Sequence, residues 1–262
     1  GAYGVETQDG EVVSMEPFLE DPDPSPIGFG MPQAIKDPVR IEQPMIRKGW
    51  LDSEGKDSSI RRGEGQYVAV SWEKAIKLVA NEMERVRKRF GNNAIYAGSY
   101  GWASAGRFHH ANSQLHRFMA SAGGYVFSKN TYSLAAGDVI LPHILGMGTF
   151  QQMEINTPLE MVADYTKLLV SFGGIPIKNT QVEGGGMGLH HVRGALEKCS
   201  RNGVRFVNFG PIKSDMINEV NCEWYANRPN TDVAIMIGLA HTIVSLELHD
   251  KKFLASHCVG FD

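Results

Sequence analysis

One serine lies where the sequence changes from a polar stretch to small and apolar residues. Ser133 is in the middle of "SKNTYSLAAGDVILPH", residues 128–143. Serine is a preferred residue at the N-cap of a helix, because its hydroxyl accepts a hydrogen bond from a backbone N–H of the first turn. The same oxygen can instead bind a ligand or a metal. From the serine alone, both interpretations remain open.

A second candidate is the segment "GSYGWASAGRFHH", residues 98–110, where two large aromatic residues alternate with glycine. Tyr100 and Trp102 each carry a polar hydrogen-bond donor, and Gly101 between them allows the backbone to approach a ligand closely. The Tyr hydroxyl and the indole N–H are suited to hydrogen-bond an oxygen atom. Alternatively, both side chains are core aromatics near the end of a strand.

Glycine-rich turns follow three apolar runs that have the character of strands. In open α/β sheets, ligands bind beyond the carboxyl ends of the strands, and free backbone N–H groups suit a diphosphate or a base. The sequence contains neither GxGxxG at a first βα turn nor GxxxxGK[ST], so plain strand-to-helix turns are the alternative. The candidate cofactor-binding residues are Gly101 and Trp102 in the first turn, Gly173 and Gly174 in the second, and Gly210 and Pro211 in the third.

Histidine and cysteine do not form a recognisable metal site. His109, His110 and His116 lack a carboxylate at a suitable spacing, which favours surface or helix-packing histidines. The three cysteines are far apart and form no CxxC pair, so neither a zinc site nor a disulfide framework is indicated.

The composition is that of a folded globular protein. Of 262 residues, 42% are hydrophobic and 21% are charged, and the net charge is −3. No basic stripe is present, so we expect no nucleic-acid partner. No apolar run approaches the roughly 18 residues of a membrane span, so we expect none.

These candidates must be positioned by two α/β parts that follow an irregular segment. Residues 1–70 are rich in Pro, Asp and Gly and predict an irregular N-terminal arm with short strands. Residues 71–160 predict an α/β part that carries Ser133. Its first helix is capped by Ser71 and stopped by Gly91, and residues 94–101 follow as a short buried strand.

Residues 161–262 alternate between strand and helix. Strands are predicted near residues 164–174 and 204–211, and helices near 188–203 and 231–250, the last with Thr231 as its cap. Alternation of this kind is typical of a parallel sheet layered with helices. The fold class is therefore α/β, and this part resembles the start of a Rossmann-like nucleotide-binding domain.

Seven short motifs resemble those of the molybdenum enzymes of the dimethyl sulfoxide reductase family, and they occur in the same order along the chain. The similarity is greatest to the single-subunit trimethylamine-N-oxide, dimethyl sulfoxide and biotin sulfoxide reductases. The motifs are "DPDPSPIG", "PMIRKGWL", "VSWEKAI", "SYGWASAGRFHH", "AGGY", "YSLAAGDVILPHILG" and "NTDVAIMIGLAHTIV". Members of this family are several times longer. The resemblance thus implies an N-terminal third (a fragment, a truncated product or one piece of a split enzyme) whose partner is the remainder of the same enzyme.

The resemblance also implies a cofactor and a reaction. The cofactor is bis(molybdopterin guanine dinucleotide) molybdenum, and Ser133 occupies the position of the serine that ligates the metal. The reaction is oxygen-atom transfer from a small-molecule S-oxide or N-oxide, in which Tyr100 and Trp102 would hydrogen-bond the oxygen being transferred. Asp232, in "NTDVA", is the candidate for contact with guanine.

Electron supply is implied as well. The N-terminal cysteine cluster that binds an iron–sulfur centre in other branches is missing here, so we expect no iron–sulfur cluster. Electrons would come directly from an external donor, and a cytochrome c-type protein is the expected partner. That donor favours the periplasm over the cytoplasm, although no leader is visible in the sequence.

Several positions depart from the family pattern. Asn130-Thr131 stands where the family has Gly-Asp, and Gly210-Pro211 stands where the second nucleotide strand ends in Asp-Pro. Glycine cannot accept hydrogen bonds through a side chain as aspartate does, so binding on the guanine side is in question. Two alternatives therefore stay open. One is a non-catalytic module that binds or assembles the pterin cofactor, and the other is a plain nucleotide-binding α/β domain.

Overall fold

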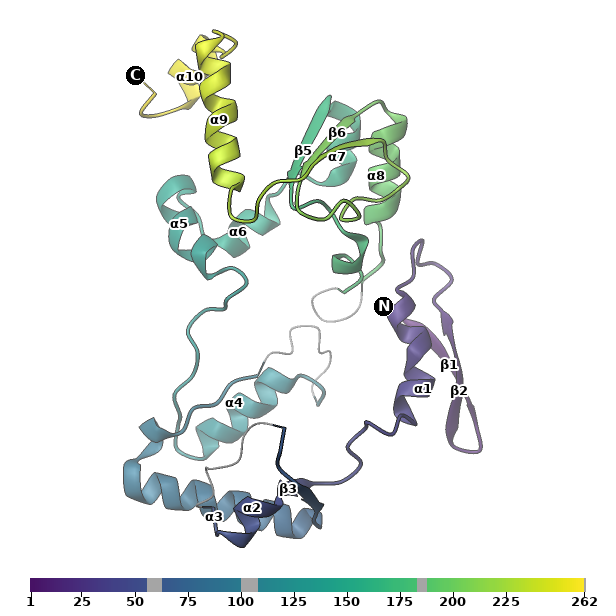
Figure 1. Cartoon of the computed structure of the whole chain (residues 1–262), viewed down its shortest axis with the longest axis vertical. Coiled ribbons are helices and arrows are strands. Elements are labelled where there is room, and N and C mark those ends of the chain that lie inside the picture. Colours follow the sequence, from purple (N-terminus) through teal and green to yellow (C-terminus); the bar gives the residue numbers. More distant parts are fainter. Residues whose placement is uncertain (56–62, 100–107, 183–187, 262) are drawn as a thin grey trace. The chain divides into compact units, whose positions relative to one another are not determined.

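A computed structural model describes residues 1–55, 63–99, 108–182 and 188–261 (Figure 1). The chain forms two units. The first comprises Gly1–Asn156 with Val182–Leu189, and the second comprises Thr157–Gln181 with His190–Asp262.

The first unit begins with an antiparallel hairpin of β1 (Tyr3–Gln8) and β2 (Glu11–Pro17). Asp9 and Gly10 form its two-residue turn, and both have positive φ, 52° and 83°. Such φ values are typical of the tight turns that suit hairpin twist. The short helices η1 (Pro26–Gly30) and α1 (Met31–Ile35) follow, and both contact β2.

Two short strands, β3 (Met45–Arg47) and β4 (Tyr67–Ala69), pair antiparallel, and α2 (Lys48–Asp52) lies between them in the sequence. The long helix α3 (Trp72–Phe90) comes next. The Ser71 hydroxyl accepts a hydrogen bond from the Lys74 N–H at 3.2 Å, and Gly91 ends the helix with φ 77°. Both ends of this helix confirm the prediction.

We expect Ser71→Ala to lower the free energy of opening at the start of α3 by about 1 kcal/mol, because a first-turn N–H loses its acceptor. Hydrogen exchange of the amides in the first turn of α3 measures this free energy. Ser71→Asn is the matched control, since its side chain also caps helices. Equal loss in both variants would contradict the capping role.

The segment after α3 corrects one prediction. Residues 94–99 form no strand: η2 (Asn92–Ala94) is followed by a single bridge between Tyr96 and Val126. Two backbone hydrogen bonds accompany the bridge, from the Ala97 N–H to the Val126 carbonyl at 3.0 Å and from the Val126 N–H to the Ile95 carbonyl at 2.8 Å. The Asn92 amide also donates to the carbonyls of Ala122 and Gly124 at 3.3 and 2.6 Å, just after α4 (Ala111–Ser121).

Two helices complete the first unit, α5 (Ala135–Leu145) and α6 (Thr149–Glu154). Pro142 lies inside α5, which continues to Leu145 and ends at Gly146 in the left-handed conformation (φ 71°). The helix therefore extends three residues beyond the proline.

The second unit contains a parallel sheet in the order β5–β6–β7, which confirms the predicted parallel α/β arrangement. The strands are Leu168–Phe172, Arg205–Phe209 and Cys222–Tyr225. The helical elements are α7 (Leu159–Tyr165), η3 (Ile177–Asn179), α8 (Val192–Arg201), α9 (Asp232–Ser245) and α10 (Lys251–His257).

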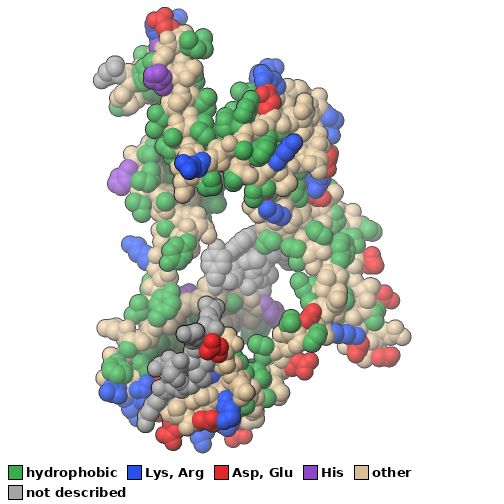
Figure 2. Space-filling view, in the orientation of Figure 1, with side chains coloured by type: hydrophobic (Ala, Val, Ile, Leu, Met, Phe, Trp, Pro, Cys, Tyr) green, Lys and Arg blue, Asp and Glu red, His purple; other side chains and the backbone are tan. Residues whose placement is uncertain are grey.

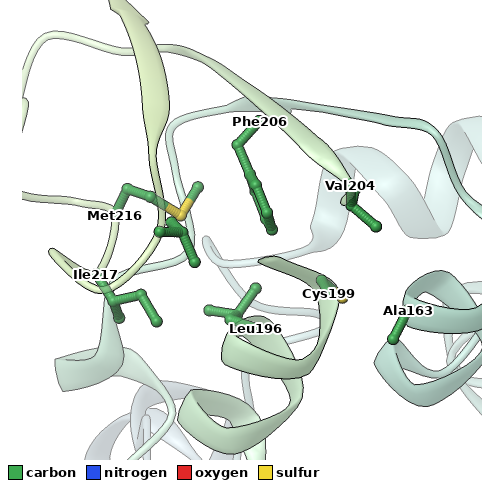
Figure 3. Close-up of a cluster of buried hydrophobic side chains, with 8 residues drawn as sticks. Ala163, Leu196, Cys199, Val204, Phe206, Met216 and Ile217 are labelled. Carbon is green, nitrogen blue, oxygen red and sulfur yellow. The ribbon is translucent and has the colours of Figure 1, made fainter. Parts of the chain in front are cut away.

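The core of the second unit lies between the sheet and helices α7 and α8 (Figure 3). Leu196 and Cys199 of α8 are fully buried, and Phe206 of β6 points toward Leu196. Burial raises the pKa of the Cys199 thiol, so this cysteine stays protonated and acts as a packing residue. The remaining members of the cluster are Ala163, Val204, Met216, Ile217 and Val220.

Helix α9 is apolar on several sides, and its hydrophobic side chains are exposed (Figure 2). Val233 and Ile237, for example, are 66% and 64% exposed. At 14 residues the helix is about 21 Å long, shorter than the hydrocarbon core of a bilayer. Throughout the described residues, no helix combines the length and hydropathy needed to cross a membrane.

Candidate functional site

Ser133 lies on the wall of a pocket of about 1100 Å³ in the first unit. Three segments line this pocket: residues 96–99, His116 of α4, and residues 127–133 together with Ala135. The pocket thus joins the end of the Tyr96–Val126 bridge to the turn that precedes α5. We call it the Ser133 pocket.

The turn before α5 is built around a strained residue. Asn130 has φ 71°, in the left-handed region, and its Oδ1 accepts a hydrogen bond from the Thr131 N–H at 3.0 Å. Asparagine tolerates this conformation better than most residues, because its short side chain hydrogen-bonds locally. The Thr131 carbonyl then accepts from the N–H of Ala135 at 3.1 Å, which closes the turn.

Ser133 does not occupy the cap position of α5. The N-cap is Leu134, whose side chain makes no capping hydrogen bond. The structure therefore assigns the cap position to the residue after Ser133. The serine is exposed and lies immediately before the cap, on the pocket wall.

His116 is exposed on α4, as expected of a surface histidine, and it also lines the Ser133 pocket. It faces the Ser133 pocket from α4, and its Nδ1 forms a short hydrogen bond with the Tyr125 hydroxyl. Tyr125 also contacts Phe127, with ring centroids 6.2 Å apart. No local signal reveals this role, because the partners come from separate segments that meet only after folding.

Tyr100, Gly101 and Trp102 lie outside the described residues, so their predicted roles stay predictions. The residues that precede them, Gly98 and Ser99, line the Ser133 pocket.

In the second unit, the glycines predicted at the strand ends come together. The Gly173 N–H donates to the Phe209 carbonyl at 2.8 Å, and the Gly210 N–H donates to the Tyr225 carbonyl at 3.2 Å. A Cβ on Gly210 would lie 3.6 Å from the Cα of Gly173. Gly210 and Pro211 therefore follow β6 beside the Gly173-Gly174 turn that follows β5.

At the carboxyl ends of the strands, the two faces of the sheet carry different kinds of side chain. Asn208 is fully buried, and its Oδ1 accepts a hydrogen bond from the Ser171 hydroxyl at 3.0 Å. Side chains alternate along a strand, so the opposite face carries the stacked rings of Phe172, Phe209 and Tyr225, with successive centroids 5.2 and 5.4 Å apart. Neither the buried pair nor the aromatic stack was predicted.

Asp232 is the first residue of α9, and its carboxylate accepts a hydrogen bond from the Asn227 amide at 2.9 Å. This contact orients the carboxylate and holds the loop between β7 and α9. A role in binding guanine stays a prediction.

Hydroxyl groups are the possible metal donors on the wall of the Ser133 pocket, and Ser133 is one of them. Within the described ranges, no cluster of three or more His, Cys, Asp or Glu could hold a metal ion.

The chain is similar to several curated enzymes. It is 42% identical to a biotin sulfoxide reductase of Cereibacter sphaeroides over 93% of its length. It is 35% identical to a dimethyl sulfoxide/trimethylamine N-oxide reductase of Rhodobacter capsulatus and 34% identical to a trimethylamine-N-oxide reductase of Haemophilus influenzae, in each case over 100% of its length. It covers 32%, 32% and 31% of these relatives, so it spans about a third of their length.

Fold and family agree with these similarities. Acetylene hydratase from Pelobacter acetylenicus shares the fold with a TM-score of 0.51 and 16% identity, over 99% of this chain and 32% of that structure. Residues 1–35 match the molybdopterin oxidoreductase N-terminal domain. Residues 40–259 match the molybdopterin oxidoreductase family itself, and this chain therefore belongs to the molybdopterin oxidoreductases.

Proposed function

We propose that the protein to which this chain belongs is a molybdenum-dependent oxidoreductase that reduces S-oxides or N-oxides. The observation that carries the proposal is the position of Ser133, on a pocket wall and off the helix cap. The relatives named as sulfoxide and N-oxide reductases support the substrate class. Overall, the oxide, two electrons and two protons give the sulfide or amine and water.

The cofactor of the proposal is bis(molybdopterin guanine dinucleotide) molybdenum, which when bound supplies the two-electron redox change and the acceptor for the oxygen atom. Ser133 would anchor the metal. Tyr100 and Trp102 would hold the substrate oxygen through hydrogen bonds, which strengthen as negative charge develops on that oxygen.

The second unit would hold the dinucleotide. Near Gly173, Gly174, Gly210 and Pro211 the dinucleotide could approach the backbone closely, since glycine has no side chain to block it. The N–H groups of Gly173 and Gly210 donate to strand carbonyls, so they would not be donors to the dinucleotide. Gly210 offers no carboxylate to guanine, so the guanine contact would fall to Asp232, which is already oriented by Asn227.

Electron supply and location are part of the same proposal. We infer that the enzyme uses no iron–sulfur cluster, receives electrons from a cytochrome c-type donor and works in the periplasm. The positions of the three cysteines, 199, 222 and 258, support only the first of these points, because they form no N-terminal cluster.

Cofactor analysis of the full-length protein tests the proposal. We expect molybdenum and extractable pterin, GMP released by acid hydrolysis, no stoichiometric iron, and dye-linked reduction of dimethyl sulfoxide, trimethylamine N-oxide, biotin sulfoxide or methionine sulfoxide. Pterin without turnover on any oxide would favour the non-catalytic cofactor-binding module. A protein that yields neither molybdenum nor pterin would instead be a plain nucleotide-binding domain.

A further inference from the structure

The Ser133 pocket contains a histidine whose role the proposed function does not explain. His116 is exposed and lines the pocket from α4. Its Nδ1 forms a short hydrogen bond with the hydroxyl of Tyr125, and the centroids of the two rings lie 5.8 Å apart. One nitrogen of the imidazole is therefore held by a partner within the protein, and Nε2 is the nitrogen left to meet a ligand.

The partner of this histidine lies on a segment that the backbone holds in place. Tyr125 is half-buried, and the next residue, Val126, is tied to residues 95–97 through both its N–H and its carbonyl. The Val126 N–H donates to the Ile95 carbonyl at 2.8 Å, and its carbonyl accepts from the Ala97 N–H at 3.0 Å. A hydrogen bond to one ring nitrogen of a histidine determines which protons the ring carries and how it is oriented. Tyr125 can therefore fix the imidazole on the pocket wall.

The proposed reaction requires two protons, which the oxygen of the oxide takes up as it becomes water. A proton donor that works near neutral pH must release a proton to this oxygen and then regain one. Lysine and tyrosine side chains ordinarily titrate near pH 10, whereas histidine does so between about pH 5 and 8.

The described part of the pocket wall includes no aspartate or glutamate that could supply these protons. The titratable groups that share this wall with His116, or contact its ring, are Tyr96, Tyr125, Lys129 and Tyr132. Among the described residues of the wall, the histidine is thus the one whose side-chain type matches the task.

We propose that His116 donates protons to the oxygen of the oxide, and that Tyr125 is a positioning residue for its ring. This inference rests on the proposed function and adds a catalytic residue to the same site. In each transfer, the Nε2–H bond of the imidazolium breaks and an O–H bond forms on the oxygen. The neutral imidazole keeps the proton on Nδ1, which donates to the Tyr125 oxygen.

The exposure of His116 completes the cycle, because Nε2 can regain a proton from solvent. Two transfers, together with the two electrons that the external donor of the proposed function supplies, convert the oxide to the sulfide or amine and water. The histidine is unchanged at the end.

Binding of an anion is the competing role for the same histidine. An imidazolium that paired with a phosphate of the cofactor would hold the cofactor, and its loss would lower the molybdenum and pterin content. A proton donor instead affects kcat and the pH dependence of kcat, and it leaves the cofactor content intact.

The first test replaces His116 by asparagine in the full-length enzyme. Asparagine keeps a polar group on the side of Tyr125 but carries no group that can donate a proton as an acid. We expect kcat for dimethyl sulfoxide to fall roughly 10²- to 10³-fold with little change in KM, the typical contribution of a general acid. The molybdenum and pterin content and the visible spectrum should match those of wild type. His143→Asn is the matched control, because His143 is exposed on α5 and is not among the residues that line the pocket.

Two further readouts distinguish proton transfer from a structural role. In wild type, kcat should decline as the pH rises from about 5 to 8, because the imidazolium loses the proton that it donates. His116→Asn should lack this decline. Added imidazole should restore part of the activity of His116→Ala, since the pocket of about 1100 Å³ has room for it.

Tyr125→Phe tests the positioning role, because it keeps the ring and removes only the hydroxyl. We expect kcat to fall roughly tenfold, the equivalent of one hydrogen bond, while the decline with rising pH remains. A variant as impaired as His116→Asn, without this decline, would assign the proton to Tyr125 instead and overturn the assignment.

Four other results would overturn the inference: unchanged kcat in His116→Asn, loss of molybdenum or pterin from that variant, an unchanged pH dependence in it, or no recovery of His116→Ala with imidazole. In each case, reduction of dimethyl sulfoxide by the wild-type enzyme would leave the proposed function intact. A wild-type enzyme without molybdenum and without activity on any oxide would instead remove the proposed function itself.

Discussion

Ser133→Ala is expected to lower oxide reduction by the full-length enzyme by about 10²- to 10³-fold, comparable to the loss of one strong transition-state contact. The alanine removes the one oxygen by which the turn before α5 would hold the metal. Ser133 is exposed and precedes the N-cap residue of α5, Leu134. Steady-state kinetics with a reduced dye and an oxide substrate measure the loss. The visible spectrum of the bound cofactor should change in parallel.

Ser128→Ala is the matched control for this prediction. Ser128 lines the same pocket, and its substitution removes the same hydroxyl group. We expect activity within about threefold of wild type, as for most exposed substitutions away from reacting groups. Ser133→Cys keeps an anionic donor and should retain molybdenum with an altered spectrum. Unchanged activity and spectrum in Ser133→Ala would contradict the assignment of Ser133 as a ligand.

Local sequence signals were sufficient to predict an element where the chain carries strong helix caps or a clear hydrophobic periodicity. Ser71 and Gly91 mark the two ends of α3, and both act as predicted. The Asp9-Gly10 turn is an equally strong signal for a hairpin, and it joins two of the short strands predicted within residues 1–70. The pairing of these two strands was not predicted, although its signal is present in the sequence.

Other parts of the fold depend on contacts between distant residues. Residues 94–99 have the composition of a strand, but they form only a single bridge to Val126, about 30 positions away. β7 has only four residues, too few for alternation to be recognised. The exposed apolar surface of α9 is typical of helices that are buried in a larger protein, and the chain spans only a third of its relatives.

At the candidate site, too, one residue could be identified from the sequence, whereas others depend on contacts between distant segments. Resemblance in the motif around residue 133 singled out the serine, and the structure adds that it lines a pocket. His116 and Lys129 could not be assigned to this pocket from spacing, because their positions depend on the turn at Asn130 and on the contact between His116 and Tyr125. A left-handed asparagine is not marked in the sequence by any neighbouring residue. The sequence therefore singled out the candidate ligand Ser133 but not the other residues of the pocket wall.

Gly174→Ala is expected to destabilise the strand ends of the second unit by about 2–4 kcal/mol, the sum of a left-handed backbone penalty and an overpacked contact. Gly174 has φ 74°, and a Cβ there would lie 2.0 Å from the carbonyl oxygen of Asp215. This oxygen accepts a hydrogen bond from the Ile175 N–H at 2.7 Å, so moving it away also breaks that bond. Hydrogen exchange of the amides of β5 and β6 measures the free energy of local opening.

Gly173→Ala separates the two causes of this loss. Gly173 has φ 94°, but nothing lies within 4 Å of the position of its Cβ. Its substitution therefore adds only the backbone penalty, about 1–2 kcal/mol. The difference between the two variants isolates the contact with Asp215. If both variants accelerate exchange equally, the close approach of Gly174 to Asp215 does not determine the geometry of this turn. A larger loss in Gly174→Ala, together with weaker retention of the dinucleotide, would show that this backbone contact shapes the proposed cofactor-binding edge.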